Sequence, residues 1–76
     1  MTLYEFNALT LGEKQATTWK LGSYLDNYVT KGVKINCYAI DKFFVEVHYN
    51  SEQNTITKVT AFKSGHNLDK YSNLQL

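Results

Sequence analysis

The chain contains neither arginine nor proline, and it has only one cysteine. All eight basic residues are lysines, so the chain lacks the planar guanidinium group that forms paired hydrogen bonds with phosphate or guanine. A formal net charge of +1 is also far from the strongly basic balance that is typical of nucleic-acid-binding domains. These absences argue against specific nucleic-acid recognition.

The single cysteine, Cys37, excludes a disulfide within the chain. A structural zinc site uses about four ligands, and Cys37, His48 and His66 do not have the paired spacings of such sites. We therefore predict no metal and no cofactor. One unpaired cysteine, with no signal-peptide pattern and no apolar run of membrane length, predicts a cytoplasmic protein without a membrane partner.

Seventy-six residues predict one domain, residues 1–76. At this size a single hydrophobic core gives marginal stability, and small proteins often gain the rest from a disulfide, a metal or a partner chain. Because the sequence excludes a disulfide within the chain and predicts no metal site, we expect the stability to come from good packing or from self-association.

A helix is predicted from Leu11, because Thr10-Leu11-Gly12-Glu13 fits a capping box. Gly32 matches the left-handed residue that ends many helices, so we expect one helix over residues 11–30. Gly22 lies on its apolar face. A glycine costs a helix about 1 kcal/mol relative to alanine, so we expect Gly22 to mark a close approach to a strand.

Shorter elements are expected at both ends of the chain. Thr2-Leu3-Tyr4-Glu5 repeats the capping pattern and predicts a short N-terminal helical segment. We expect a turn at residues 64–67, one helical turn at 68–71, and an apolar tail at 74–76 that docks on another surface.

Three runs with alternating apolar and polar residues, 33–39, 43–49 and 55–62, predict strands with one buried face. The predicted fold class is α+β. One long helix packs on a three-stranded antiparallel meander in the order α-β-β-β, with short helical turns at both termini.

The first hairpin has two possible registers. A two-residue turn at Asp41-Lys42 would place Cys37 opposite Glu46 and would mix apolar with polar residues on each face. An odd-length loop at residues 40–42 would instead place Cys37 opposite Val45, and this is the register we predict. For the second hairpin, a five-residue loop at 50–54 would place Glu46 opposite Lys58.

The face of the sheet away from the long helix is predicted to carry an aromatic half. This candidate interaction surface contains Tyr38, Phe44, Phe62, His48 and Lys58. Clustered exposed aromatic residues need cover, so either the chain termini or a second molecule should lie over them.

Two groups on the strands could carry chemistry. Cys37 could be a nucleophile, although our register points it into the core, where a cysteine behaves as a small hydrophobe. His48 and Glu46 share a face and could form an acid/base pair, but an open sheet face offers no pocket for a substrate. We therefore predict that the protein is not an enzyme and has no catalytic residues.

The segments Trp19–Leu25, Phe43–Tyr49 and Val59–Phe62, together with Ile56 and Tyr71, resemble a group of short uncharacterised bacterial α+β proteins. The resemblance implies a bacterial origin. It implies no activity and no site residues.

The leading hypothesis from the sequence is a small non-enzymatic protein-interaction or regulatory module. It would bind a protein partner or self-associate, as a homodimer for example, through the outer sheet face. The alternative is a weak single-stranded nucleic-acid-binding module that uses lysines and aromatic residues of the sheet.

Overall fold

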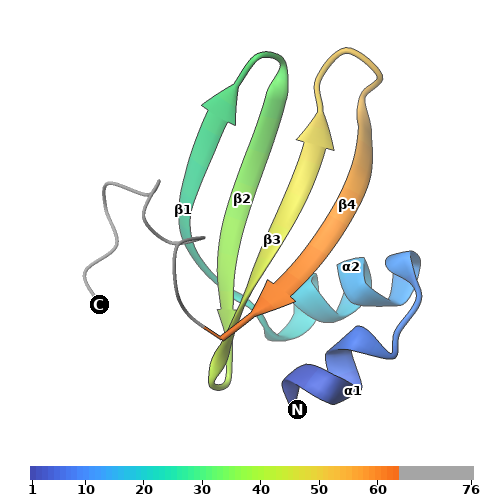
Figure 1. Ribbon diagram of the computed structural model, residues 1–76, viewed down its shortest axis with the longest axis vertical. Helices are drawn as coiled ribbons and strands as arrows, with labels where there is room; N and C mark the ends of the chain where they lie inside the picture. The colour runs from blue at the N-terminus through green and yellow to red at the C-terminus, as the bar shows by residue number, and fades with distance from the viewer. Residues whose placement is uncertain (64–76) are drawn as a thin grey trace.

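The computed structural model of the chain describes residues 1–63, which form two helices followed by four strands (Figure 1). The elements are α1 (Leu3–Asn7), α2 (Leu11–Leu21), β1 (Ser23–Thr30), β2 (Val33–Ile40), β3 (Phe43–Asn50) and β4 (Thr55–Phe62). The strands form one antiparallel sheet in the order β1-β2-β3-β4. The predicted α+β class is confirmed, whereas the single long helix and the three-stranded sheet are wrong. The elements predicted at 64–67, 68–71 and 74–76 lie outside the described residues.

Both helices begin as the sequence predicts, with capping boxes at Thr2 and Thr10. In α2 the amide of Glu13 donates to the Thr10 hydroxyl at 3.2 Å, and the Thr10 amide donates to the Glu13 carboxylate at 2.9 Å. The backbone hydrogen bond from Thr10, followed by that with its side chain, lowers the pKa of Glu13. Glu5 makes the same reciprocal bonds with Thr2 in α1.

The predicted long helix ends early, because residues 23–30 form strand β1 instead of a continuation of α2. This segment contains Tyr24, Tyr28 and Val29, and aromatic and β-branched side chains favour a pleated surface. Gly32 was interpreted as a helix terminator. Its φ of 79° and the φ of 40° at Lys31 instead form a two-residue turn between β1 and β2.

Gly22 marks the close approach to a strand that the sequence predicts. It caps the C-terminal end of α2 and does not lie within the helix. A Cβ atom added there would lie 2.5 Å from the carbonyl oxygen of Thr18 and 3.2 Å from the Cβ of Tyr38. A side chain would therefore push the end of α2 away from β2.

The turn between β2 and β3 contains two residues, Asp41 and Lys42, and it places Cys37 opposite Glu46. Our predicted pairing of Cys37 with Val45 is therefore wrong. The prediction placed Val33, Ile35, Cys37 and Ala39 on the helix side and Ile40 in the loop. In the structure Ile40 faces them, whereas Ile35 and Cys37 form a second small cluster on the outer face.

The register of β3 with β4 is displaced by two residues from the predicted one. Val45 lies opposite Ala61, and Lys58 lies opposite His48 instead of Glu46. Because the displacement is even, residues 58–62 of β4 keep their predicted faces. The bulge turns Ile56 to the helix side, where it packs against the core. A bulge next to His48 and a four-residue connection at 51–54 replace the predicted five-residue loop.

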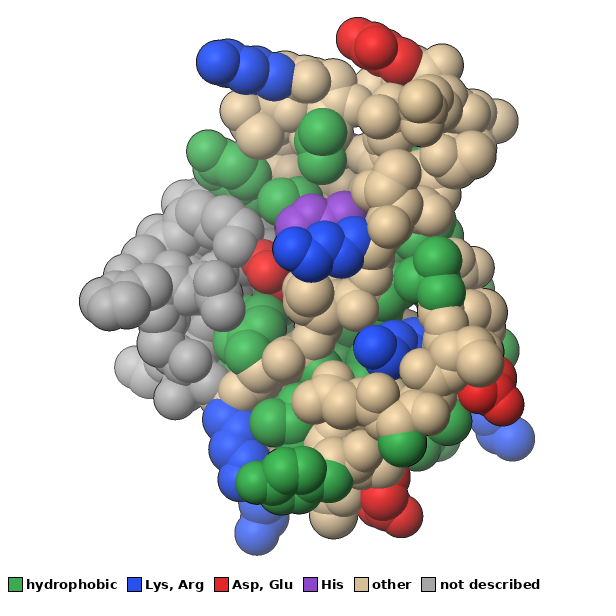
Figure 2. Space-filling view, turned by 45° about the vertical axis from the view of Figure 1, so that its right-hand side comes forward, with side chains coloured by type: hydrophobic (Ala, Val, Ile, Leu, Met, Phe, Trp, Pro, Cys, Tyr) green, Lys and Arg blue, Asp and Glu red, His purple; other side chains and the backbone are tan. Residues whose placement is uncertain are grey.

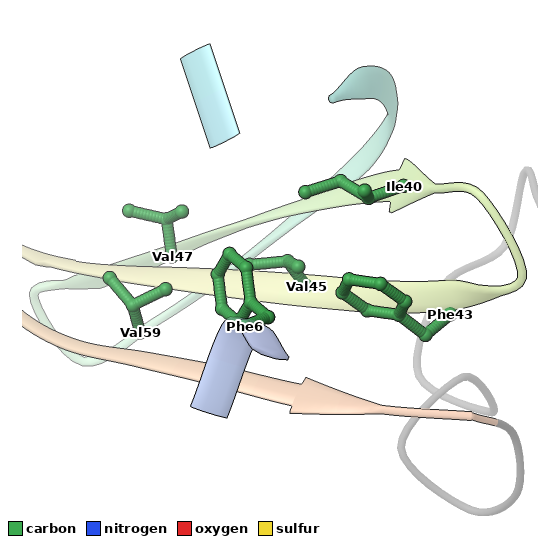
Figure 3. Packing of buried hydrophobic residues seen from close by; sticks show 6 residues of the cluster. All are labelled: Phe6, Ile40, Phe43, Val45, Val47 and Val59. Atoms are coloured by element: carbon green, nitrogen blue, oxygen red, sulfur yellow. The ribbon is translucent and has the colours of Figure 1, made fainter. Parts of the chain in front are cut away.

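The larger core cluster lies between the helices and the sheet (Figure 3). Phe6 of α1 is fully buried over β3, with its ring centroid 5.6 Å from that of Phe43. The other buried members are Ile40, Val45, Val47 and Val59. Phe6 thus fixes the short helix α1 on the helix-side face of the sheet.

Both helices lie toward the end of the sheet that carries the β2–β3 turn (Figure 1). The opposite end, with the β1–β2 and β3–β4 turns, extends beyond α2 on the same face. Within residues 1–63 neither helix is long and apolar enough to cross a membrane.

The contact at Gly22 predicts unequal effects for two glycine substitutions. Gly22→Ala should lower the free energy of unfolding by about 1–3 kcal/mol, because the new methyl group has no space. Gly12→Ala in the same helix is the control. It has no atom within 4 Å of the added Cβ and should raise stability by about 0.4–1 kcal/mol. Urea unfolding of both variants measures the difference, and equal effects would contradict the close approach.

The capping box of α2 predicts a pH dependence. Folding lowers the pKa of Glu13 from its ordinary value of 4.5. The ionised Glu13 carboxylate therefore stabilises the fold at pH values above 4.5, and this contribution is lost as the pH falls through the lower pKa of the folded state. Wild type should therefore exceed Glu13→Gln in stability at neutral pH, and the two should converge in acid. Glu52→Gln, at an exposed turn residue, is the control. A difference that stays constant with pH would argue against the capping role.

Candidate functional site

The outer face of the sheet, away from the helices, carries a row of side chains that crosses all four strands. Asp26 of β1 lies opposite Cys37 of β2, Cys37 lies opposite Glu46 of β3, and Glu46 lies opposite Thr60 of β4. Directly opposed residues on one sheet face have neighbouring Cβ atoms. The fold therefore places a thiol between two acidic side chains.

This row is buried: Cys37 is 0% exposed, Glu46 4% and Asp26 7%. The sequence predicts the burial of Cys37, and that prediction is confirmed, although its face is not the predicted one. The two buried acidic residues were missed. Asp26 was assigned to a helix, and Glu46 was expected on a solvated face, so no local signal connected them with Cys37.

The neighbouring row on the same face contains Tyr28, Ile35, His48 and Lys58 in successive strands. The Nε2 atom of His48 lies 4.0 Å from the Oε1 atom of Glu46, which is the more buried of the two side chains. Figure 2 shows a histidine beside a lysine near the middle of the visible face, with an acidic side chain close by. His48 thus lies between an acidic and a basic side chain.

The chemistry of this face is limited by its composition. An activated cysteine needs partial exposure and an electropositive neighbour, whereas Cys37 is buried between acidic residues. Within residues 1–63 no group of three or more His, Cys, Asp and Glu side chains is placed to hold a metal ion. The surface hollows beside the N-terminus and α2 are lined by residues that do not belong to this row. The row is therefore best explained as a packed polar layer.

Of the five residues predicted as an interaction surface, four share the outer face and one does not. Phe44 and Phe62 stack with ring centroids 5.8 Å apart, and His48 lies opposite Lys58. Tyr38 is the exception. The two-residue β2–β3 turn places its side chain on the helix side, so the predicted aromatic trio is wrong.

Tyr38 instead belongs to an aromatic ladder on the helix side. Its ring stacks with that of Trp19 at 6.3 Å between centroids, and Tyr24 meets it edge-on at 5.7 Å. Burial, and next the neighbouring Tyr24, raise the pKa of Tyr38. The sequence did not reveal this ladder, because Tyr24 was placed in a helix. The aromatic and β-branched residues after Gly22 are the signal that could have revealed it.

Strand β1 is one of the two edge strands of the described sheet, and it carries exposed apolar side chains. Tyr24 is 55% exposed and Val29 65%, and Tyr28 lies at the margin of exposure. Within β1 there is no lysine and no proline, and its single charged residue, Asp26, is buried. This edge therefore lacks side chains that would oppose pairing with another strand.

No family model matches the chain, and comparisons with curated proteins and with solved structures found no match. The resemblance to short bacterial α+β proteins stays a prediction. The functional argument therefore depends on the geometry of the residues themselves.

The burial of Cys37 predicts slow thiol chemistry. In native buffer, the aromatic disulfide reagent DTNB should label it on the order of a thousandfold more slowly than in denaturant, because a stability of about 5 kcal/mol leaves fewer than one molecule in a thousand open. The control is glutathione, whose rate should not change by this factor. Rapid stoichiometric labelling of the folded protein would show that Cys37 is accessible.

Proposed function

We propose that the protein is a small non-enzymatic protein-interaction module that self-associates through the edge of β1. The observation that carries this proposal is the exposure of apolar side chains on a strand that no other strand of residues 1–63 pairs on its outer edge. An exposed strand edge presents a row of amide and carbonyl groups that can pair with a second strand. The proposed partner is a second copy of this chain.

The composition of β1 supports this choice. Natural edge strands are usually protected by lysine, proline, short length or a covering element. β1 has eight residues, and a bulge between Tyr24 and Asp26 leaves the regular stretch 26–30 for pairing. Tyr28 and Val29 lie in this stretch and point to opposite faces of the sheet. Both faces of a paired edge would therefore gain apolar contact.

The opposite edge of the sheet is a poorer candidate. β4 carries Lys58 in its centre, whereas β1 has no lysine. Both helices also pack beside β4. A lysine and a covering helix are the devices that prevent edge pairing, so self-association is expected at β1 alone.

The contact surface thus differs from the one expected from the sequence. The centre of the outer face, at Cys37 and Glu46, is already buried. Tyr38, which was predicted on this face, lies on the helix side. Little accessible apolar area remains there for a partner. An edge-paired dimer would instead extend the four-stranded sheet to eight strands, which suits a small chain with limited core.

The absence of enzymatic activity belongs to the same proposal. The one acid/base pair identified on the sheet, His48 with Glu46, lies within a packed row and not at a hollow with room for a substrate. A cytoplasmic location and a bacterial origin are also proposed, the first from the presence of a single cysteine in the chain and the second from the resemblance of the sequence.

Sedimentation equilibrium tests the self-association. Wild type should show a concentration-dependent monomer–dimer equilibrium, and Tyr28→Lys should shift it to monomer, because the change removes an aromatic contact and adds like charges across the two-fold axis. Thr57→Lys, an exposed position on β4, is the matched control and should dimerise like wild type. A wild-type protein that remains monomeric at millimolar concentration would overturn the proposal.

A further inference from the structure

Two hollows meet at Trp19 on the helix side of the molecule. The first, of about 570 Å³, lies between α2 and the part of the sheet that extends beyond it. Its lining includes Trp19, Gln15, Lys34, Asn36, Tyr49 and Asn54. The second, of about 550 Å³, lies on α2 itself and includes Lys20. Because both hollows share Gln15 and Trp19, they form one track that crosses the helix, which we call the Trp19 track.

The tryptophan ring is held in a defined position along this track. Tyr38 stacks on Trp19 with an interplanar angle of 27°, and Tyr24 supports Tyr38 from the side. Trp19 nevertheless remains 59% exposed. A fixed and accessible aromatic ring is a platform for another flat ring, and stacking of this kind is the main source of affinity for unpaired nucleotide bases.

The charges of the track are of one sign. Lys34 lines the first hollow and Lys20 the second, and among residues 1–63 no carboxylate lines either one. Of two acidic residues near these lysines in the sequence, Glu13 is hydrogen-bonded to Thr10 at the start of α2, and Asp26 is buried on the opposite sheet face. A cation on each side of an aromatic ring suits a chain with regularly spaced negative charges.

The remaining polar groups of the track suit contacts without a fixed sequence. Gln15, Asn36 and Asn54 present carboxamides, which can both donate and accept hydrogen bonds. The Tyr49 hydroxyl is hydrogen-bonded to the Oδ1 atom of Asn54, so the two side chains form a joint wall. The absence of arginine excludes the usual paired contact with guanine, and lysine contacts with phosphate are independent of sequence.

We propose that the Trp19 track binds single-stranded nucleic acid without sequence preference. One base stacks on Trp19, and the phosphates on its two sides lie near Lys34 and Lys20. This surface lies on the helix side, whereas the sequence suggested the outer sheet face for such binding. A duplex is excluded as a ligand, because its bases are already stacked on one another and cannot reach the ring.

Trp19 is the only tryptophan of the chain, so its fluorescence reports directly on the track. Titration with an oligothymidylate of about ten nucleotides should quench this fluorescence at low salt. With two phosphate contacts, raising the salt from about 50 to about 200 mM should weaken binding roughly 7-fold. A duplex of the same length should bind much more weakly.

Substitutions separate stacking from charge. Trp19→Ala should weaken binding of a labelled oligonucleotide roughly 5- to 150-fold, and Trp19→Phe much less. Lys34→Gln and Lys20→Gln should each remove one phosphate contact. Each should therefore reduce the slope of the logarithm of the binding constant against the logarithm of the salt concentration by about 0.7. Lys58→Gln removes the same charge from the opposite sheet face and should leave binding unchanged.

Three outcomes would overturn the proposal. The first is no quenching by the oligonucleotide at low salt, and the second is a loss of affinity in Lys58→Gln equal to that in Lys34→Gln or Lys20→Gln. The third is an affinity for thymidine monophosphate equal to that for the oligonucleotide, since a mononucleotide cannot reach both lysines. The dimer proposal is tested separately by Tyr28→Lys. That variant should bind the oligonucleotide like wild type, because Tyr28 lies on the other face of the sheet from Trp19.

Discussion

The two-residue turn at Asp41 and Lys42 determines which face of the sheet each side chain of β2 occupies, and most of the surface chemistry follows from it. Side chains alternate between faces, so a turn longer by one residue would exchange every one of them. With the observed turn, Tyr38 lies under Trp19, and Cys37 lies between Asp26 and Glu46. The aromatic ladder and the buried acidic row are two consequences of one register.

The end of α2 at Gly22 is the second constraint, because it releases residues 23–30 to form a strand. The close packing of Gly22 on Tyr38 brings the helix directly onto β2, and β1 then returns along the other side of β2. Because residues 23–30 form a strand, α2 has only 11 residues. A helix of this length does not cover the whole helix-side face of the sheet, and the larger hollow of the Trp19 track lies in the part beyond α2.

The features that could be predicted from the sequence are local ones. Both capping boxes depend on residues three positions apart, and three of the four strands follow from simple alternation. The close approach at Gly22 and the burial of Cys37 were also predicted correctly. Each of these requires information from a few neighbouring residues only.

The features that were missed depend on contacts between distant residues. Lys31-Gly32 fits both a helix end and a hairpin turn, and only the pairing of residues 23–30 with β2 decides between them. Register was misjudged because Ile35 and Cys37 were predicted on the helix side, whereas they are buried on the outer face. Four of the five predicted surface residues still share that face, because an even displacement of β4 preserves its alternation.

The net charge of +1 conceals a separation of charges that the fold creates. Five of the seven acidic residues have structural roles: Glu5 and Glu13 in helix caps, Asp26 and Glu46 in the buried outer row, and Asp41 in an ion pair of 2.7 Å with the amino group of Met1. Lys20 and Lys34 line open hollows instead. Screening limits such charges to a range of about 10 Å in ordinary salt, so a ligand at Trp19 responds to the nearby lysines more than to the sum over the chain. A near-neutral composition is therefore compatible with a locally basic binding surface.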